Sequence, residues 1–229
     1  MPQRDPAVVI NSDEYTATME LVYNYFKMTE TDAQRISDEI TTQKRQAYEA
    51  ELTLLAGQAG CPSVGAADQY TLESIDGQAL AEAVGIVNTY NYDLAQAIIQ
   101  VHNGNPKANR NTYWDQLTAW NNGRAEWKYV QISMHNEQEW RAQAQLDFTT
   151  YNDLSGWAEL LPKRAAEPIC QEVAARERIP MKEAQDLMAS WPPHLNCPHY
   201  FVIHSDQIPD CGDMWLGANS GAYIQQGGH

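Results

Sequence analysis

The sequence predicts a mainly α-helical protein, a long-helix bundle or arm followed by a small irregular α+β C-terminal module. Apolar residues recur at helical spacing through about the first 150 residues, and stretches rich in Gly, Pro and Asn separate these runs. After residue 150, prolines gather together with three of the four cysteines. We therefore expect a helical domain or arm over 1–150, a Cys/His/Pro-rich α+β module over 151–216 and a flexible tail over 217–229.

The first two helices are expected to begin at polar capping residues. Asn11 is followed by Glu14 in a capping arrangement, and Thr31 with Gln34 resembles a capping box. Each pair precedes apolar residues at helical spacing: Met19, Val22, Tyr23 and Phe26 in the first helix, and Ala33, Ile36, Ile40, Ala47 and Leu54 in the second. The Gly- and Pro-containing residues 57–65 end the second helix.

A second helical block is expected from near Asp76, with an interruption around 85–89 and a resumption over 91–102. Residues 103–111 form a turn by composition. Apolar and aromatic residues between Tyr113 and Met134 then predict a helix from about residue 112 into the 140s, with a weak point at 121–123. A Trp-rich stripe of this kind is typical of helix packing.

The charge of the chain disfavours several classes of function. Thirty acidic residues against fifteen basic ones give a formal net charge of −15, which repels phosphate and argues against a broad nucleic-acid-binding surface. The one local basic excess, at Lys107, Arg110, Arg124 and Lys128, is interpreted as a solvated helix face. No apolar run approaches the roughly 18 residues needed to cross a bilayer, so we expect no membrane insertion.

Familiar catalytic signatures are absent from the sequence. It contains no GxxxxGK[ST] loop, no GxGxxG after a strand, no GxSxG elbow and no HExxH. His135 lies in "HNEQEW", where no second histidine follows, so it is expected to be a surface or packing residue. We predict a protein that is not an enzyme.

The stretch "WPPHLNCPHYF" (191–201) carries the densest chemistry. His194 and Cys197 have the spacing of two zinc ligands from one turn, and His199 and Cys170 complete a Cys₂His₂ set. Their convergence requires a tight bend held by the prolines at 192, 193 and 198, and His204 or Cys211 can displace one ligand. The sequence thus offers Cys170, His194, Cys197 and His199 as candidate ligands of a structural zinc ion, while no other cofactor is expected.

Other interpretations of this cluster stay open. The cysteines can form a buried reduced cluster, or a Cys170–Cys197 disulfide. Nucleophilic catalysis by Cys197, with His194 or His199 as base, lacks an orienting third group. Trp191 and Phe201 flank the cluster and are expected to anchor it in a core.

Residues 168–203, "PICQEVAARERIPMKEAQDLMASWPPHLNCPHYFVI", resemble the C-terminal signature of the Mu-type minor head, or head morphogenesis, proteins of tailed bacteriophages. That signature has a cysteine-containing segment, a short "gkvfpldea" piece and then "PPHPNCRC" or "PPHPNCRH". The matching pieces are Cys170, "RIPMKEA" (178–184) and "PPHLNCPH" (192–199), while Glu167 stands where the family has its first cysteine. Residues 109–144 are similar to the preceding helix with its "IARTE"-like element, although that arginine is missing at "ISMHNE".

The resemblance implies a virion component made in the host cytoplasm and bound in the head near the portal vertex. Such a protein serves head morphogenesis or DNA delivery, with the portal or the major capsid protein as partner and copies of itself as a further partner. An acidic surface near packaged DNA avoids being trapped on the genome. The alternatives are a metal- or Cys-dependent hydrolase using the 191–201 cluster, and a zinc-ribbon-like nucleic-acid-binding regulator, which the charge disfavours.

Overall fold

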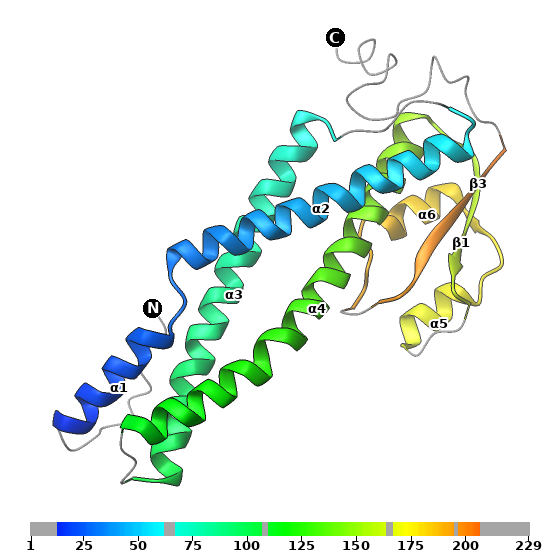
Figure 1. The fold of residues 1–229 in the computed structure, drawn as a ribbon. Helices are drawn as coiled ribbons and strands as arrows, with labels where there is room; N and C mark the ends of the chain where they lie inside the picture. The colour runs from blue at the N-terminus through cyan, green and yellow to red at the C-terminus, as the bar shows by residue number, and fades with distance from the viewer. Residues whose placement is uncertain (1–12, 62–66, 107–109, 164–166, 195–196, 207–229) are drawn as a thin grey trace. The chain divides into compact units, whose positions relative to one another are not determined.

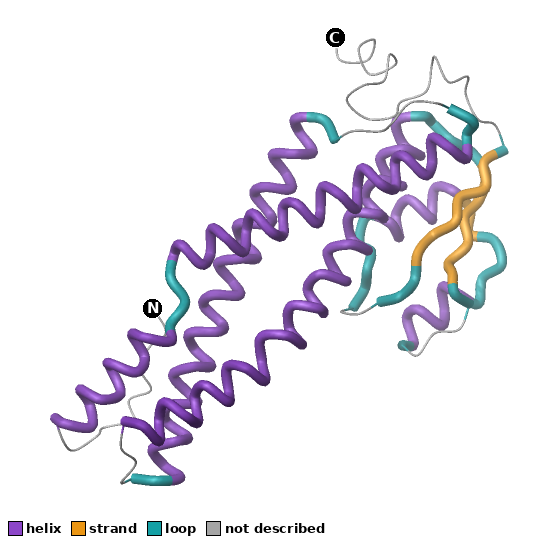
Figure 2. Tube along the Cα trace, in the orientation of Figure 1, coloured by secondary structure: helices purple, strands orange, loops and turns teal. Residues whose placement is uncertain are grey.

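The computed structural model describes residues 13–61, 67–106, 110–163, 167–194 and 197–206. Four helices come first, α1 (Asp13–Phe26), α2 (Glu30–Gln58), α3 (Gln69–Gly104) and α4 (Arg110–Tyr151) (Figure 1). They are followed by β1 (Gly156–Leu161), α5 (Pro168–Ala174), β2 (Ile179–Pro180), α6 (Met181–Met188) and β3 (Tyr200–Ser205). Among the described residues, all strands lie after α4 (Figure 2). The predicted mainly α fold with a small C-terminal α+β region is confirmed, since helices hold 73% of the interpretable residues.

The cap of α2 lies two residues before the predicted one. The Asp32 backbone N–H donates to Thr29 Oγ1 at 3.4 Å, and Asp32 Oδ2 accepts from the Thr29 backbone N–H at 2.8 Å. This reciprocal pair is the capping box of α2. The predicted pair of Thr31 and Gln34 is wrong because both residues lie within the helix. Asn11 falls outside the described residues.

Helix α3 is continuous, so the predicted interruption around 85–89 is wrong and the predicted start near Asp76 is too late. Asp68 begins the helix by accepting the Thr71 backbone N–H at 2.8 Å. Gly85 lowers helix propensity, but Ala83 and Val87 on either side of it are buried and hold that turn by packing. Helix α4 likewise runs through the expected weak point at 121–123.

The chain forms two compact units, and α2, α3 and α4 each contribute to both. The first consists of Met1–Glu39 and Gly77–Val130 and the second of Ile40–Asp76 and Gln131–His229. The core of the first unit is built from α1, α3 and α4 residues that include the predicted Val22, Tyr113 and Leu117. The division into 1–150, 151–216 and 217–229 stays a prediction, and the tail lies outside the described residues.

The helical part of the second unit has an apolar core. Tyr48, Leu52, Trp140 and Phe148 are buried there together, whereas Leu54, predicted to be on the buried stripe, is exposed. The remaining predicted positions on α2 are buried: Ala33, Ile36, Ile40 and Ala47.

Two polar contacts bridge α2 and α4. Lys44 has no exposed side-chain surface and its Nζ lies 3.1 Å from Glu139 Oε2. Gln145 donates to Glu51 Oε1 at 2.7 Å and to the Phe201 carbonyl at 2.9 Å. Gln145 therefore joins α2, α4 and β3 within this unit.

The three strands form an antiparallel sheet in the order β2-β1-β3. In the pairing of β1 with β3, Leu160 lies opposite Phe201 and Trp157 opposite His204. Leu160 and Phe201 belong to a second core, which also contains residues of α5, α6 and the segments next to them: Cys170, Val173, Ala174, Ala184, Met188, Trp191 and Cys197. The sheet thereby places the cysteines of the sequence cluster in a buried core.

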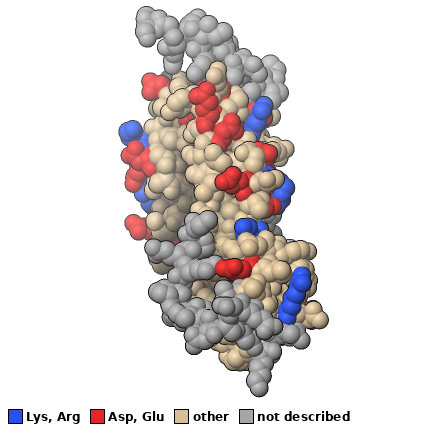
Figure 3. All heavy atoms as spheres, turned by 90° about the vertical axis from the view of Figure 1, so that its left-hand side faces the viewer, with Lys and Arg blue, Asp and Glu red and all other residues tan. Residues whose placement is uncertain are grey.

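Acidic and basic side chains are interspersed on the face shown in Figure 3. Two ion pairs along α2 join residues four positions apart, Arg35 with Glu39 and Arg45 with Glu49. No helix within the described ranges is both long enough and apolar enough to span a bilayer.

Candidate metal centre

Cys170 is positioned by the short helix α5. Glu167 occupies the N-cap position and Pro168 follows it, where the missing N–H of proline costs no hydrogen bond. Cys170, Val173 and Ala174 lie three and four residues apart, and all three are buried in the core of the module. Glu167, which stands in place of the family's first cysteine, is exposed.

His194 and Cys197 come from the segment that follows α6. Trp191 Nε1 donates to the His199 carbonyl at 3.1 Å, and the Trp191 ring packs edge-to-face on Phe201 with centroids 5.0 Å apart. The Trp191–Pro192 peptide bond is cis. Trp191 and Phe201 are 5% and 2% exposed, so the prediction that they anchor this segment in a core is confirmed.

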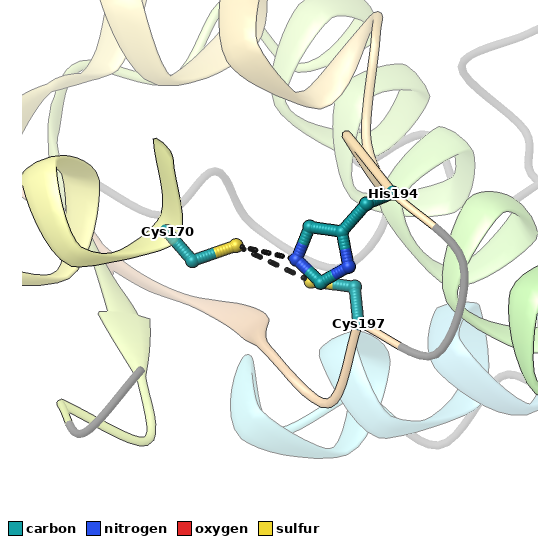
Figure 4. A group of neighbouring side chains, drawn as sticks. All are labelled: Cys170, His194 and Cys197. Atoms are coloured by element: carbon teal, nitrogen blue, oxygen red, sulfur yellow. Dashed lines mark hydrogen bonds between the residues drawn. The ribbon is translucent and has the colours of Figure 1, made fainter. Parts of the chain in front are cut away.

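The structure brings together three of the four predicted ligands (Figure 4). Cys170 Sγ lies 3.0 Å from His194 Nε2 and 3.7 Å from Cys197 Sγ, although these residues are 24 and 27 positions away in the chain. All three ligand atoms lie within 4.8 Å of one another, and both cysteines are buried. In the part of the chain that the structure describes, this is the one such group of Cys, His, Asp or Glu residues that could hold a metal ion.

His199, the fourth predicted ligand, stands beside this group but is not part of it. Its ring is buried, and its Nδ1 lies 3.6 Å from Cys197 Sγ. His204 is engaged elsewhere, since it stacks on Trp157 and its Nε2 lies 3.2 Å from Glu159 Oε1. Cys211 lies outside the described residues.

The two cysteines are free thiols, so the Cys170–Cys197 disulfide considered above is not formed. Their 3.7 Å separation greatly exceeds the length of an S–S bond, about 2.05 Å. Burial, together with the hydrogen bond to Cys197, raises the pKa of Cys170 to about 12. Without a metal ion this thiol is therefore protonated at neutral pH, which makes it a poor nucleophile.

Two polar residues, one of which contacts the strand after the Cys/His group, were not found by sequence reasoning. Gln145 reaches the Phe201 carbonyl from the middle of α4, and Glu51 on α2 accepts a hydrogen bond from the same side-chain amide. Burial raises the pKa of Glu51, although the hydrogen bond from Gln145 acts in the opposite direction. The sequence analysis singled out neither residue, because nothing in the local pattern distinguishes them from other polar residues of these helices.

Comparisons of this chain with protein-family models, with curated proteins and with solved structures found no match.

Proposed function

We propose that this chain is a structural and assembly protein of a bacteriophage head, of the minor head protein type, which acts near the portal vertex. The observation that carries the proposal is that the pieces of the family-like signature pack against one another. Cys170, from its first piece, contacts His194 and Cys197 from its last. Residues around the middle piece, Ile179 and Ala184, are buried in the same core. The pieces of the 168–203 stretch thus share one core, to which β1 also contributes Ala158 and Leu160.

The helices offer surfaces for the protein partners that such a role requires. Leu80 and Val84 on α3 lie four residues apart, and both are more than 40% exposed. Leu21 and Tyr25 on α1 have the same spacing and are also exposed. Pairs of large apolar side chains at this spacing suit the packing of a partner helix. Portal and major capsid proteins are the partners that we propose for these faces.

The proposed role of the Cys/His group is structural. A zinc ion held by Cys170, His194 and Cys197 would link α5 to the segment before β3, across a part of the chain with little regular structure. Two thiolates and an imidazole are ligands that zinc favours. The proposal assigns the chain no catalytic step.

Quantitative mass spectrometry of purified particles tests the proposed function. We expect the chain in mature heads or in head-assembly intermediates, at far fewer copies than the major capsid protein. Its absence from both kinds of particle would contradict the proposal.

The partner surface is tested with Leu80→Glu, which places a charge on the exposed apolar pair of α3. Ala81→Glu is the matched control, because it makes the same change at the adjacent exposed position of the same helix. We expect Leu80→Glu to reduce incorporation into heads at least several-fold more than Ala81→Glu. Equal incorporation of the two variants would remove this surface from the proposal.

A further inference from the structure

We propose that His199 supplies the fourth ligand of the metal centre, through Nδ1, and that zinc at this centre is tetrahedral with no open position. The ligand atoms are Cys170 Sγ, Cys197 Sγ, His194 Nε2 and His199 Nδ1. This inference rests on the proposed function, in which the Cys/His group holds a structural zinc ion, and it specifies that the ion has four protein ligands. Coordination number matters because it separates a structural zinc from a catalytic one.

Two of the distances between these atoms match the edges of a zinc tetrahedron. With Zn–S bonds of about 2.3 Å and Zn–N bonds of about 2.0–2.1 Å, ideal angles give S···S edges of about 3.7–3.8 Å and S···N edges of about 3.6 Å. Cys170 Sγ and Cys197 Sγ lie 3.7 Å apart, and Cys197 Sγ and His199 Nδ1 lie 3.6 Å apart. The 3.0 Å between Cys170 Sγ and His194 Nε2 is shorter than its edge, so His194 would have to move outward slightly.

The His199 ring is buried beside Cys197. The carbonyl of His199 is held by Trp191 Nε1, and its ring is only 2% exposed. Cys197 and His199 are two residues apart in the chain, and the 3.6 Å between Cys197 Sγ and His199 Nδ1 puts their side chains on the same side of the segment. His199 stands outside the three-residue group, so rotation of its ring about the Cα–Cβ bond has to complete the set.

A fourth protein ligand changes what the metal can do. A catalytic zinc keeps one coordination position for water or substrate, whereas a structural zinc has four protein ligands. Both cysteines and His199 are buried, which is in keeping with the second kind. With His199 bound, the centre would tie α5, the segment after α6 and the start of β3 to one ion.

Titration of the full-length, metal-free chain with Zn²⁺ and with Co²⁺ tests this inference. Wild type is expected to bind one equivalent of either ion, with the visible absorption of a tetrahedral cobalt site. His199→Ala is expected to weaken zinc binding by about 100-fold or more, beyond the 10–100-fold typical of losing an outer-shell partner. The thiolate-to-cobalt absorption should persist in this variant, because both cysteines remain, and added imidazole should restore the tetrahedral bands. His204→Ala is the matched control, and it should bind like wild type because His204 pairs with Glu159.

His199→Cys tests the same position by replacing the imidazole with another zinc ligand instead of removing it. It should retain one tightly bound ion and add the absorption of a third thiolate. If His199→Ala and His199→Cys both keep the affinity and spectrum of wild type, the fourth position is open and the inference is wrong. If wild type binds no ion, the structural metal of the proposed function fails as well, while detection of the chain in heads still tests the assembly role separately.

Discussion

Trp191 should be the most costly single side chain to remove from the C-terminal module. It is almost completely buried, packs edge-to-face on Phe201 and donates a hydrogen bond to the His199 carbonyl. Truncation of a buried Trp to Ala typically costs about 3–5 kcal/mol. The His199 carbonyl also loses its indole donor, and a buried acceptor without a partner costs about 1–3 kcal/mol. For Trp191→Ala we therefore expect a loss of at least about 4 kcal/mol.

A second substitution at the same position separates the two contributions. Trp191→Phe keeps an aromatic ring against Phe201 but removes the indole N–H, so it should cost less than Trp191→Ala and more than about 1 kcal/mol. Tyr200→Ala is the control, because Tyr200 lies beside Phe201 on β3 with 44% of its surface exposed. We expect it to cost less than about 1 kcal/mol.

Native-state hydrogen exchange is the appropriate assay, since it reports the opening free energy of individual segments. The amides of β1 and β3 belong to the module that Trp191 supports, and amides of α3 in the first unit serve as an internal reference. If protection of β1 and β3 falls by less than about 1 kcal/mol in Trp191→Ala, the argument from burial and hydrogen bonding is refuted.

Three further predictions concern the second unit. Burial raises the pKa of the Glu51 and Asp147 carboxyl groups, so each binds a proton more tightly in the folded state than in the unfolded state. In urea unfolding, the free energy of unfolding should therefore rise as pH falls through the raised pKa values toward the unfolded pKa near about 4. A Glu51→Gln/Asp147→Asn double variant should flatten that rise. Lys44→Met should leave the free energy of urea unfolding nearly unchanged, because Glu139 is 34% exposed and can be solvated. Glu139→Gln removes a partner of a buried ammonium and should cost about 2 kcal/mol or more. A larger loss of stability in Lys44→Met than in Glu139→Gln would contradict this account of the pair. Gly156→Ala should cost about 2 kcal/mol or more in thermal unfolding. Gly156 has φ +125°, and an added Cβ would lie 2.2 Å from the His204 backbone oxygen of β3. An unchanged melting temperature would rule out this close approach.

The features that could be predicted from sequence are those encoded by local pattern. Helical periodicity predicted the long helices, and the density of Cys, His and Pro predicted three residues that lie together, Cys170, His194 and Cys197. Helix interruptions were harder to predict, because Gly85 suggests a break by propensity whereas Ala83 and Val87 preserve the helix by burial. The cap of α2 was misplaced because several nearby residues can act as caps, and only the backbone selects Thr29.

Long-range contacts could not be predicted from local pattern. Lys44 looks like a surface residue in sequence, yet its side chain is completely buried beside Trp140 and Glu139. Gln145 likewise gives no local sign that it reaches both Glu51 and β3. Each depends on which helix faces come together, and the charge of a residue does not specify that. The candidate metal ligands were easier to group because Cys and His residues are few in this chain and have restricted roles.

The central position of β1 affects the order in which the module can fold. Trp157 on β1 pairs with Pro180 and with His204, so both neighbouring strands come from later in the chain and no short hairpin brings either one to it. Contacts at such sequence separation form slowly, because the entropy of closing the intervening loops is lost before the strands pair. Before β3 pairs with β1, the backbone N–H and C=O groups along that edge of β1 are unpaired, and such an edge is a template for pairing with other chains. A chain shortened before residue 200 should consequently aggregate rather than retain a smaller stable module.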